Sequence, residues 1–114
     1  MIMRKFDYRA PRFVVDLPVR LMFDGTLQQG RCIEISTEGM KVAVDRPLAL
    51  ECTGRVRLAH EDTVLELPFR LVHSGPSFDG VRFIYESDEQ RDDVIRLVSQ
   101  VAGPRHRQGP VLVR

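Results

Sequence analysis

The sequence predicts a mostly β protein, a six-stranded antiparallel β-barrel followed by one C-terminal α-helix. From Phe13 to Ile84, short runs rich in Val, Leu, Ile and Phe are interrupted by Gly, Pro and Asp, which is typical of strands joined by tight turns. After Ser87 the apolar residues follow a helical spacing instead. A chain of 114 residues suits one domain, so we expect a single core.

The first two strands are predicted to form a hairpin. An apolar run from Val14 to Phe23 ends at Asp24-Gly25, a dipeptide that tolerates the positive φ angles of a type I′ turn. The chain then returns as a strand over Gln28–Ser36. Pro18 has no backbone donor, so the first strand should be bent at that point or lie at an edge.

Four more strands are predicted from alternating apolar residues and breaks. Thr37-Glu38-Gly39 ends the second strand, and His60-Glu61-Asp62 forms a turn before the fifth. Pro68 lies within the fifth strand and implies a bulge or an edge position. The predicted third to sixth strands cover residues 40–44, 55–58, 63–74 and 81–84.

The C-terminal helix is predicted from a start signal and an apolar stripe. Ser87-Asp88-Glu89-Gln90 has the form of a capping box, with acidic residues in the first turn. An apolar stripe at helical spacing should cover the open end of the barrel, and Gly103-Pro104 should end the helix. The stripe consists of Val94, Leu97, Val98 and Val101.

These elements give a domain plan for the whole chain. Residues 1–12 are expected to be a flexible basic arm, 13–86 the barrel, 87–103 the helix and 104–114 a mobile tail. Together they make a single domain over residues 8–102.

Charge and composition exclude several classes of function. The formal net charge is +1, from 17 basic and 16 acidic residues, and such a balance argues against general affinity for duplex DNA or anionic membranes. No apolar stretch suits a signal peptide or a membrane span, so we expect a cytoplasmic protein without membrane insertion. Cys32 and Cys52 have no zinc or disulfide spacing, and both should be reduced.

The sequence predicts no catalytic, metal or cofactor site. His60, His73 and His106 lack the pairing of metal ligands, and no serine or cysteine nucleophile motif accompanies them. They are therefore interpreted as surface or half-buried structural residues. A barrel for single-stranded nucleic acid is also disfavoured, because it needs several exposed aromatic residues beside basic ones, and most of the Phe and Tyr residues fall at core-facing positions.

Two features could bind a nucleotide. The first is the basic arm, which carries Arg4, Lys5, Arg9 and Arg12; arginine can donate two parallel hydrogen bonds to the edge of guanine and can stack on its face. In the second, Glu34 and Ser36 lie at i and i+2 at a strand end, followed by Gly39. The carboxylate can accept hydrogen bonds from guanine, and the glycine permits a left-handed turn and close backbone approach. Taken singly, these features are a solvated arm and a strand-ending turn.

Taken together, the two features resemble the PilZ family, whose pattern is RxxxR followed by D/N-x-S-x-x-G. Arg12 matches the second arginine, and Ser36 and Gly39 match the serine and glycine. Tyr8 stands at the first arginine position, where the nearest substitutes are Arg9, which gives RxxR, or Lys5, which gives KxxxR with Arg9. Glu34 replaces Asp/Asn. The resemblance runs from about Tyr8 to Val98 and implies a PilZ-like split barrel.

The resemblance implies a non-catalytic bacterial signalling domain that binds cyclic di-GMP, which would be a ligand and not a cofactor. It assigns Arg9 and Arg12 to guanine and phosphate, Glu34 and Ser36 to a guanine edge, and Gly39 to backbone fit. Binding would order the arm and relay the signal to a protein partner of motility, secretion or biofilm machinery. The alternative is a degenerate PilZ adaptor that does not bind cyclic di-GMP and acts through protein–protein interaction.

Overall fold

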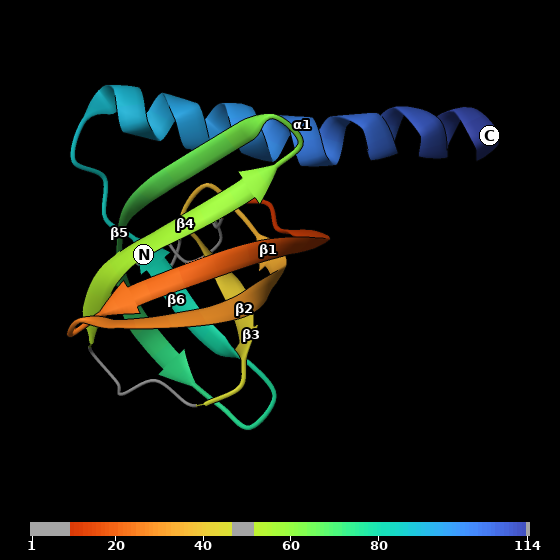
Figure 1. The fold of residues 1–114 in the computed structure, drawn as a ribbon. Coiled ribbons are helices and arrows are strands. Elements are labelled where there is room, and N and C mark those ends of the chain that lie inside the picture. Colours follow the sequence, from red (N-terminus) through yellow and green to blue (C-terminus); the bar gives the residue numbers. More distant parts are fainter. Residues whose placement is uncertain (1–9, 47–51, 114) are drawn as a thin grey trace, which may run out of the picture.

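The computed structural model describes residues 10–46 and 52–113, with side chains as far as Ala102. Six antiparallel strands close into a barrel in the order β1-β2-β3-β6-β5-β4, and one helix lies across an end of it (Figure 1). This confirms the predicted fold class. The elements are β1 Phe13–Phe23, β2 Thr26–Ile35, β3 Gly39–Val44, β4 Thr53–His60, β5 Thr63–Ser74, β6 Asp79–Phe83 and α1 Asp88–Val113.

The first hairpin has the predicted two-residue turn. Phe23 pairs with Thr26, and the residues between them, Asp24 and Gly25, have φ angles of 49° and 71°. Positive φ at both central positions fits the twist of the two strands, which explains why an Asp-Gly dipeptide stands here.

Two strand pairs join segments that are distant in sequence and close the barrel, namely β3 with β6 and β1 with β4. Because the barrel is closed, Pro18 does not lie on a free edge. It pairs with Arg31 of β2, follows an irregularity in β1 between Val14 and Leu17, and precedes the start of the β1–β4 pairing at Val19. The missing backbone N–H of proline is tolerated here, because the pairing of β1 with β4 begins only at the next residue.

Pro68 also differs from the expectation of an edge or a local bulge. It pairs with Arg55 of β4, and its carbonyl oxygen accepts a hydrogen bond of 2.9 Å from the Ile84 amide. The bulge of β5 lies further along, between Leu71 and His73. The proline is accommodated where the β5–β6 ladder ends, because few donors are needed there.

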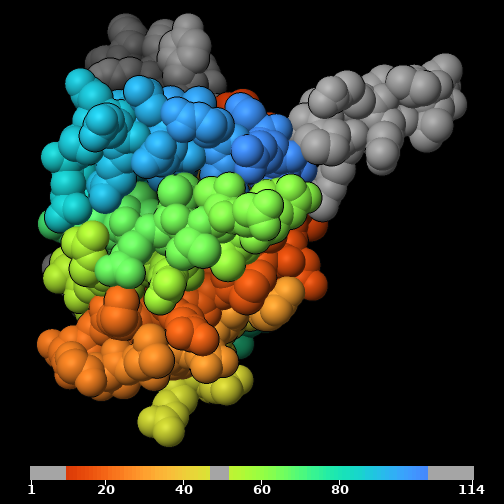
Figure 2. All heavy atoms as spheres, turned by 45° about the horizontal axis from the view of Figure 1, so that its top comes forward, coloured from red at the N-terminus to blue at the C-terminus, as the bar shows by residue number. Residues whose placement is uncertain are grey.

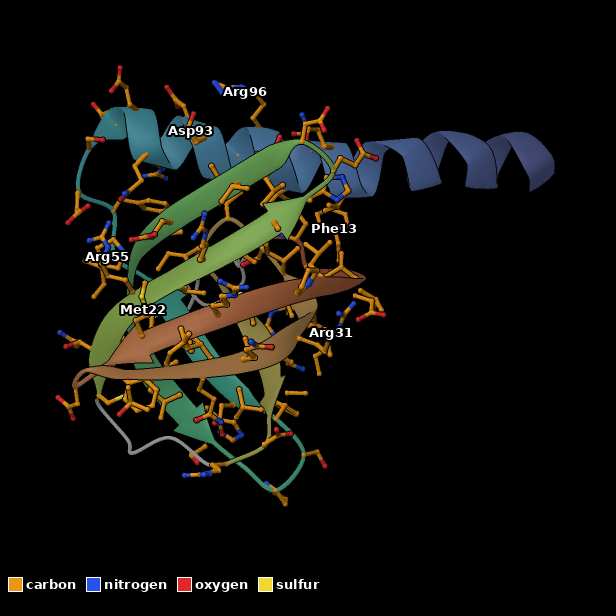
Figure 3. The ribbon with its side chains drawn as sticks, in the orientation of Figure 1. Phe13, Met22, Arg31, Arg55, Asp93 and Arg96 are labelled. Atoms are coloured by element: carbon orange, nitrogen blue, oxygen red, sulfur yellow. The ribbon has the colours of Figure 1, made fainter. Side chains whose placement is uncertain are left out.

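The core fills the barrel and continues under the helix. Alternate residues of the strands point inward, and the inward set is buried, with Leu21, Val42 and Phe69 fully so. The predicted helical stripe of Val94, Leu97, Val98 and Val101 completes the same cluster. Figure 2 shows the described part of α1 lying against the green hairpin of β4 and β5. On the opposite side of the helix, Asp93 and Arg96 point away from the barrel and form an ion pair of 3.2 Å (Figure 3).

The helix starts as predicted and ends later. Ser87 Oγ accepts a hydrogen bond of 3.1 Å from the Gln90 amide, and Gln90 Oε1 accepts one of 2.8 Å from the Glu86 amide. The expected end at Gly103 is wrong, because α1 continues through Pro104 to Val113 and extends past the barrel (Figure 1). A proline inside a helix removes one donor and one i→i−4 bond, and the helix can continue beyond that loss.

An ion-pair group fastens the start of the helix to the barrel. Arg55 of β4 contacts Glu66 of β5 at 3.2 Å and Glu86, just before α1, at 3.3 Å. Figure 3 shows Arg55 beside the connection that leads to the helix. The hydrogen bonds from Arg55 and Gln90 lower the pKa of Glu86. Within the described residues, no helix carries a sufficiently long apolar stretch to cross a bilayer.

Candidate functional site

The predicted site residues meet at one hollow on the outside of the barrel. The hollow has a volume of about 310 Å³ and lies where the end of β2, the following turn, β3 and β6 come together. Arg12, Glu34, Ser36 and Gly39 all line it. We call it the β3–β6 pocket. Arg9, the fifth predicted residue, lies outside the described residues.

Glu34 is the centre of an ion-pair group on one wall of the pocket. Its carboxylate lies 3.6 Å from the Arg12 guanidinium and 3.4 Å from Lys41 Nζ, and its side chain is 23% exposed. The register explains the second contact, because Glu34 and Lys41 are paired directly across β2 and β3. The pocket therefore already contains an acceptor that competes with any ligand for these two cations.

Ser36 builds the turn that forms the floor of the site. Its Oγ accepts hydrogen bonds from the Glu38 amide at 3.0 Å and the Gly39 amide at 3.3 Å, while its own amide donates to the Gly39 carbonyl at 2.9 Å. The residue is only 7% exposed. Its hydroxyl thus satisfies backbone donors that would otherwise lack partners, which is a structural use of the serine in this state.

Tyr85 holds the same turn from the other side. Its hydroxyl donates a hydrogen bond to the Thr37 carbonyl oxygen, which connects the turn to the segment that follows β6. Partial burial raises the pKa of Tyr85 to about 12, so the hydroxyl remains a donor at physiological pH. The turn is fixed by side chains at both ends.

Gly39 is required by close packing of strands and not by a left-handed turn. Among the described glycines only Gly25 has a positive φ. A Cβ at Gly39 would instead meet the Val81 carbonyl oxygen and, at 3.1 Å, the Arg82 Cα. The close backbone approach expected from the sequence exists, but the neighbour is β6, which pairs with β3 at this position.

The opposite wall contains residues that were not predicted as site residues. Phe78, between β5 and β6, presents its ring to Lys41 Nζ at 4.6 Å from the centroid, and the His73 ring lies 5.3 Å from the same centroid. Arg82 of β6 completes this wall. The pocket therefore combines cations, the carboxylates of Glu34 and Glu38 and an aromatic face, and a nucleotide's phosphates and bases bind to groups of these kinds.

Only part of this wall had a signal in the sequence. Lys41 is two residues from Gly39 in an alternating strand, so its outward position beside Glu34 could have been deduced. His73, Phe78 and Arg82 reach the pocket because β6 pairs with β3. That pairing is non-local, because the segment between β3 and β6 in sequence forms β4 and β5.

The cysteines take no part in the pocket. Both thiols are free, and Cys32 is fully buried. Its Sγ donates a hydrogen bond of 3.4 Å to the Glu34 carbonyl oxygen, and burial raises its pKa to about 12. A thiol with such a high pKa is a poor nucleophile, so Cys32 is a core residue.

A comparison with protein families shows to which family the chain belongs. The family described as PilZ domain matches residues 7–100, which is most of the chain. The chain belongs to the PilZ domain family. In this PilZ domain the serine and glycine of the family pattern are present, and the structure places both in the turn at the pocket.

Two solved structures share the fold of this PilZ domain. The PilZ domain of CeSA from a cellulose-synthesizing bacterium is similar with a TM-score of 0.71 and 21% identity, covering 82% of this chain and 99% of that one. An uncharacterized protein from Legionella has a TM-score of 0.65 and 14% identity, covering 84% and 98% respectively. At these identities the likeness concerns the fold alone. No curated protein sequence matches the chain.

Proposed function

We propose that this PilZ domain is a non-catalytic receptor for cyclic di-GMP. The observation that carries the proposal is the meeting of Arg12, Glu34 and the Ser36–Gly39 turn at one pocket, although they come from separate segments of the sequence. Arg12 would donate to guanine or phosphate oxygens, and Glu34 would accept from the N1–H and N2–H edge of guanine. A cytoplasmic location goes with this proposal, because the ligand is an intracellular messenger.

The ion pairs of Glu34 define what binding must change. Guanine N–H groups can replace Arg12 and Lys41 as partners of the carboxylate, and the ligand phosphates can then take the two cations. The two cations exchange one charged partner for another, and the carboxylate keeps hydrogen-bond donors in the neutral guanine N–H groups, so no charge is left buried without a partner. Such an exchange makes the wall of the pocket compatible with a dianionic ligand.

The relay would use the N-terminal segment. Arg12 lies just before β1 and lines the pocket, so the chain enters the barrel at the proposed binding site. Arg9 would join Arg12 in holding the ligand and fix this arm over the pocket. An ordered arm gives a protein partner a new surface.

Isothermal titration with cyclic di-GMP tests the proposal. Wild type should bind at micromolar concentration or tighter, and Arg12→Ala should weaken binding at least tenfold, because a hydrogen bond to a charged group contributes about 1.5–3 kcal/mol. Arg31→Ala is the matched control, since Arg31 is exposed, paired with Asp16 at 2.7 Å and outside the pocket. Equal loss in both variants would contradict the assigned role of Arg12.

The second candidate is the adaptor that acts without cyclic di-GMP. Its support is the Glu34 group itself, because Arg12 and Lys41 already have a carboxylate partner within the pocket. If wild type gives neither heat nor a thermal shift with cyclic di-GMP, the adaptor becomes the better account. Protein partners would then be sought with Arg12→Ala as a comparison.

A further inference from the structure

Two arginines stand directly opposite each other beside the pocket. Arg70 of β5 and Arg82 of β6 are register partners in the antiparallel ladder, and both side chains are exposed. Like charges in directly opposed positions destabilise a sheet. A fold that keeps such a pair therefore has a use for it, or compensates it with acids nearby.

No compensation is found within the described residues. Arg82 has Gly39 as its other neighbour across the sheet, and Arg70 has Thr53. None of the ion pairs between described side chains includes either arginine. Among the described side chains, therefore, none forms an ion pair with these arginines, and their positive charge is available to an external anion.

A second arginine pair on another side of the barrel shows the contrast. Arg20 of β1 and Arg57 of β4 are also register partners, but Arg57 has Glu66 opposite it on β5. This second pair does not line the pocket. The pair that includes a pocket residue is thus the one whose cross-strand neighbours contain no acid.

The distribution of charge in the pocket also points to the wall formed by β5 and β6 as the place where an anion binds. On the Glu34 side, two cations share one carboxylate, so that wall has one net positive charge from Arg12, Lys41 and Glu34. Arg82 and Arg70 add two more, against one exposed carboxylate, that of Glu38, which also lines the pocket and forms no ion pair with a described side chain. A ligand with two phosphodiester groups needs a positive group on each side of its ring, and this wall supplies the second.

We propose that Arg82, with Arg70 beside it, forms a phosphodiester-binding subsite on the β5–β6 wall of the pocket. The subsite rests on the proposed function, and neither of its residues belongs to the two segments that match the family pattern. Arg82 contacts the phosphate from the pocket wall, and Arg70 supplies a second guanidinium from the next strand. Binding relieves the repulsion between the two arginines, so the ligand removes a destabilising contact as it binds.

Titration with cyclic di-GMP at low and near-physiological salt tests the subsite. The double variant R70Q/R82Q should bind at least tenfold more weakly than wild type, with a smaller dependence on salt, because it loses two charge contacts. The single variant Arg82→Lys should bind better than Arg82→Gln, since it keeps the charge. The ³¹P resonance of the bound ligand should change between wild type and the double variant.

The matched control is R20Q/R57Q, which removes an equal charge from an equal cross-strand arrangement away from the pocket. Thermal unfolding of R70Q/R82Q without ligand should occur at the wild-type temperature or slightly above, which separates lost binding from lost structure. Wild-type affinity in R70Q/R82Q would overturn the subsite while the proposed function stands. Equal weakening in R20Q/R57Q would overturn it in favour of a general charge effect. Absence of binding by wild type would overturn the proposed function and the subsite with it.

Discussion

Arginine side chains have different partners in two regions of the molecule. One region is the side of the barrel under the start of α1, and the other is the wall of the β3–β6 pocket. Under the helix, Val94 and Leu97 are buried, and Arg55 is paired with both Glu66 and Glu86. At the pocket wall, Arg82 lies opposite Arg70, another arginine. In the first region Arg55 has two carboxylate partners, whereas in the second neither Arg82 nor Arg70 forms an ion pair with a described side chain. The first region contributes buried apolar side chains and ion pairs to the fold, and the pocket wall keeps groups that an anion can use.

The largest expected effect is a loss of stability at the helix. Leu97→Ala should lower the free energy of unfolding by about 2–5 kcal/mol, because it removes a side chain that is 1% exposed and leaves a cavity. Ile95→Ala, at a position that is 40% exposed, should change it by less than about 0.5 kcal/mol. Urea unfolding measures both. A small effect of Leu97→Ala would mean that α1 contributes little to the core.

A smaller loss is expected where the pocket wall depends on strand packing. Gly39→Ala should destabilise by about 1–3 kcal/mol, because its Cβ would overlap the Val81 carbonyl oxygen and push β3 from β6. Gly80→Ala is the control, since its Cβ would meet only the His73 Cβ, at 3.2 Å. Chemical denaturation compares the two variants. If Gly80→Ala were the more damaging, close packing at Gly39 would not explain the glycine.

The turn at the pocket should be less sensitive still. Ser36→Ala leaves the Glu38 and Gly39 amides without their side-chain acceptor and should cost about 1–2 kcal/mol of unfolding free energy. Ser74→Ala, at the exposed end of β5, should be nearly neutral. Amide hydrogen exchange in residues 36–39 should become faster in Ser36→Ala alone. Unchanged exchange would show that the hydroxyl does not hold the turn.

The smallest effect is expected from the exposed ion pairs at the start of α1, and it depends on pH. Arg55 and Gln90 lower the folded-state pKa of Glu86 from its usual 4.5, so the charged contacts stabilise the fold above that pH and lose their effect as the pH falls through the lowered value. Glu86→Gln should therefore unfold at a lower temperature than wild type at pH 7. The difference should vanish well below pH 4.5. A difference that persists in acid would assign the effect to something other than charge.

Prediction from sequence succeeded where the signal is local. Asp24-Gly25 marks a turn because both residues accept positive φ, and the stripe that contains Val94 and Leu97 marks a helix face, so both could be predicted. The helix end was missed, because a Gly-Pro pair lowers helical preference without forbidding continuation, and α1 runs to Val113.

Some residues of the candidate site could likewise be predicted from a local pattern, and others could not. Glu34, Ser36 and Gly39 lie in one short segment with a recognisable spacing, and all three line the pocket as predicted residues. The role expected for Gly39 was only half right, because the backbone that approaches it belongs to β6. Phe78 and Arg82 could not be found from spacing, since their place at the pocket follows from the pairing of β3 with β6.

By itself, the sequence determined which residues form strands, where the first hairpin turns and which face of α1 is buried, because these depend on neighbours a few positions apart. The tertiary structure decided which strands close the barrel and therefore which side chains share the pocket. It alone set Arg82 opposite Arg70 and brought Arg82 to the same pocket as Glu34 and Lys41. The pairing of β3 with β6 joins residues 37 to 43 positions apart, and no local pattern records that pairing.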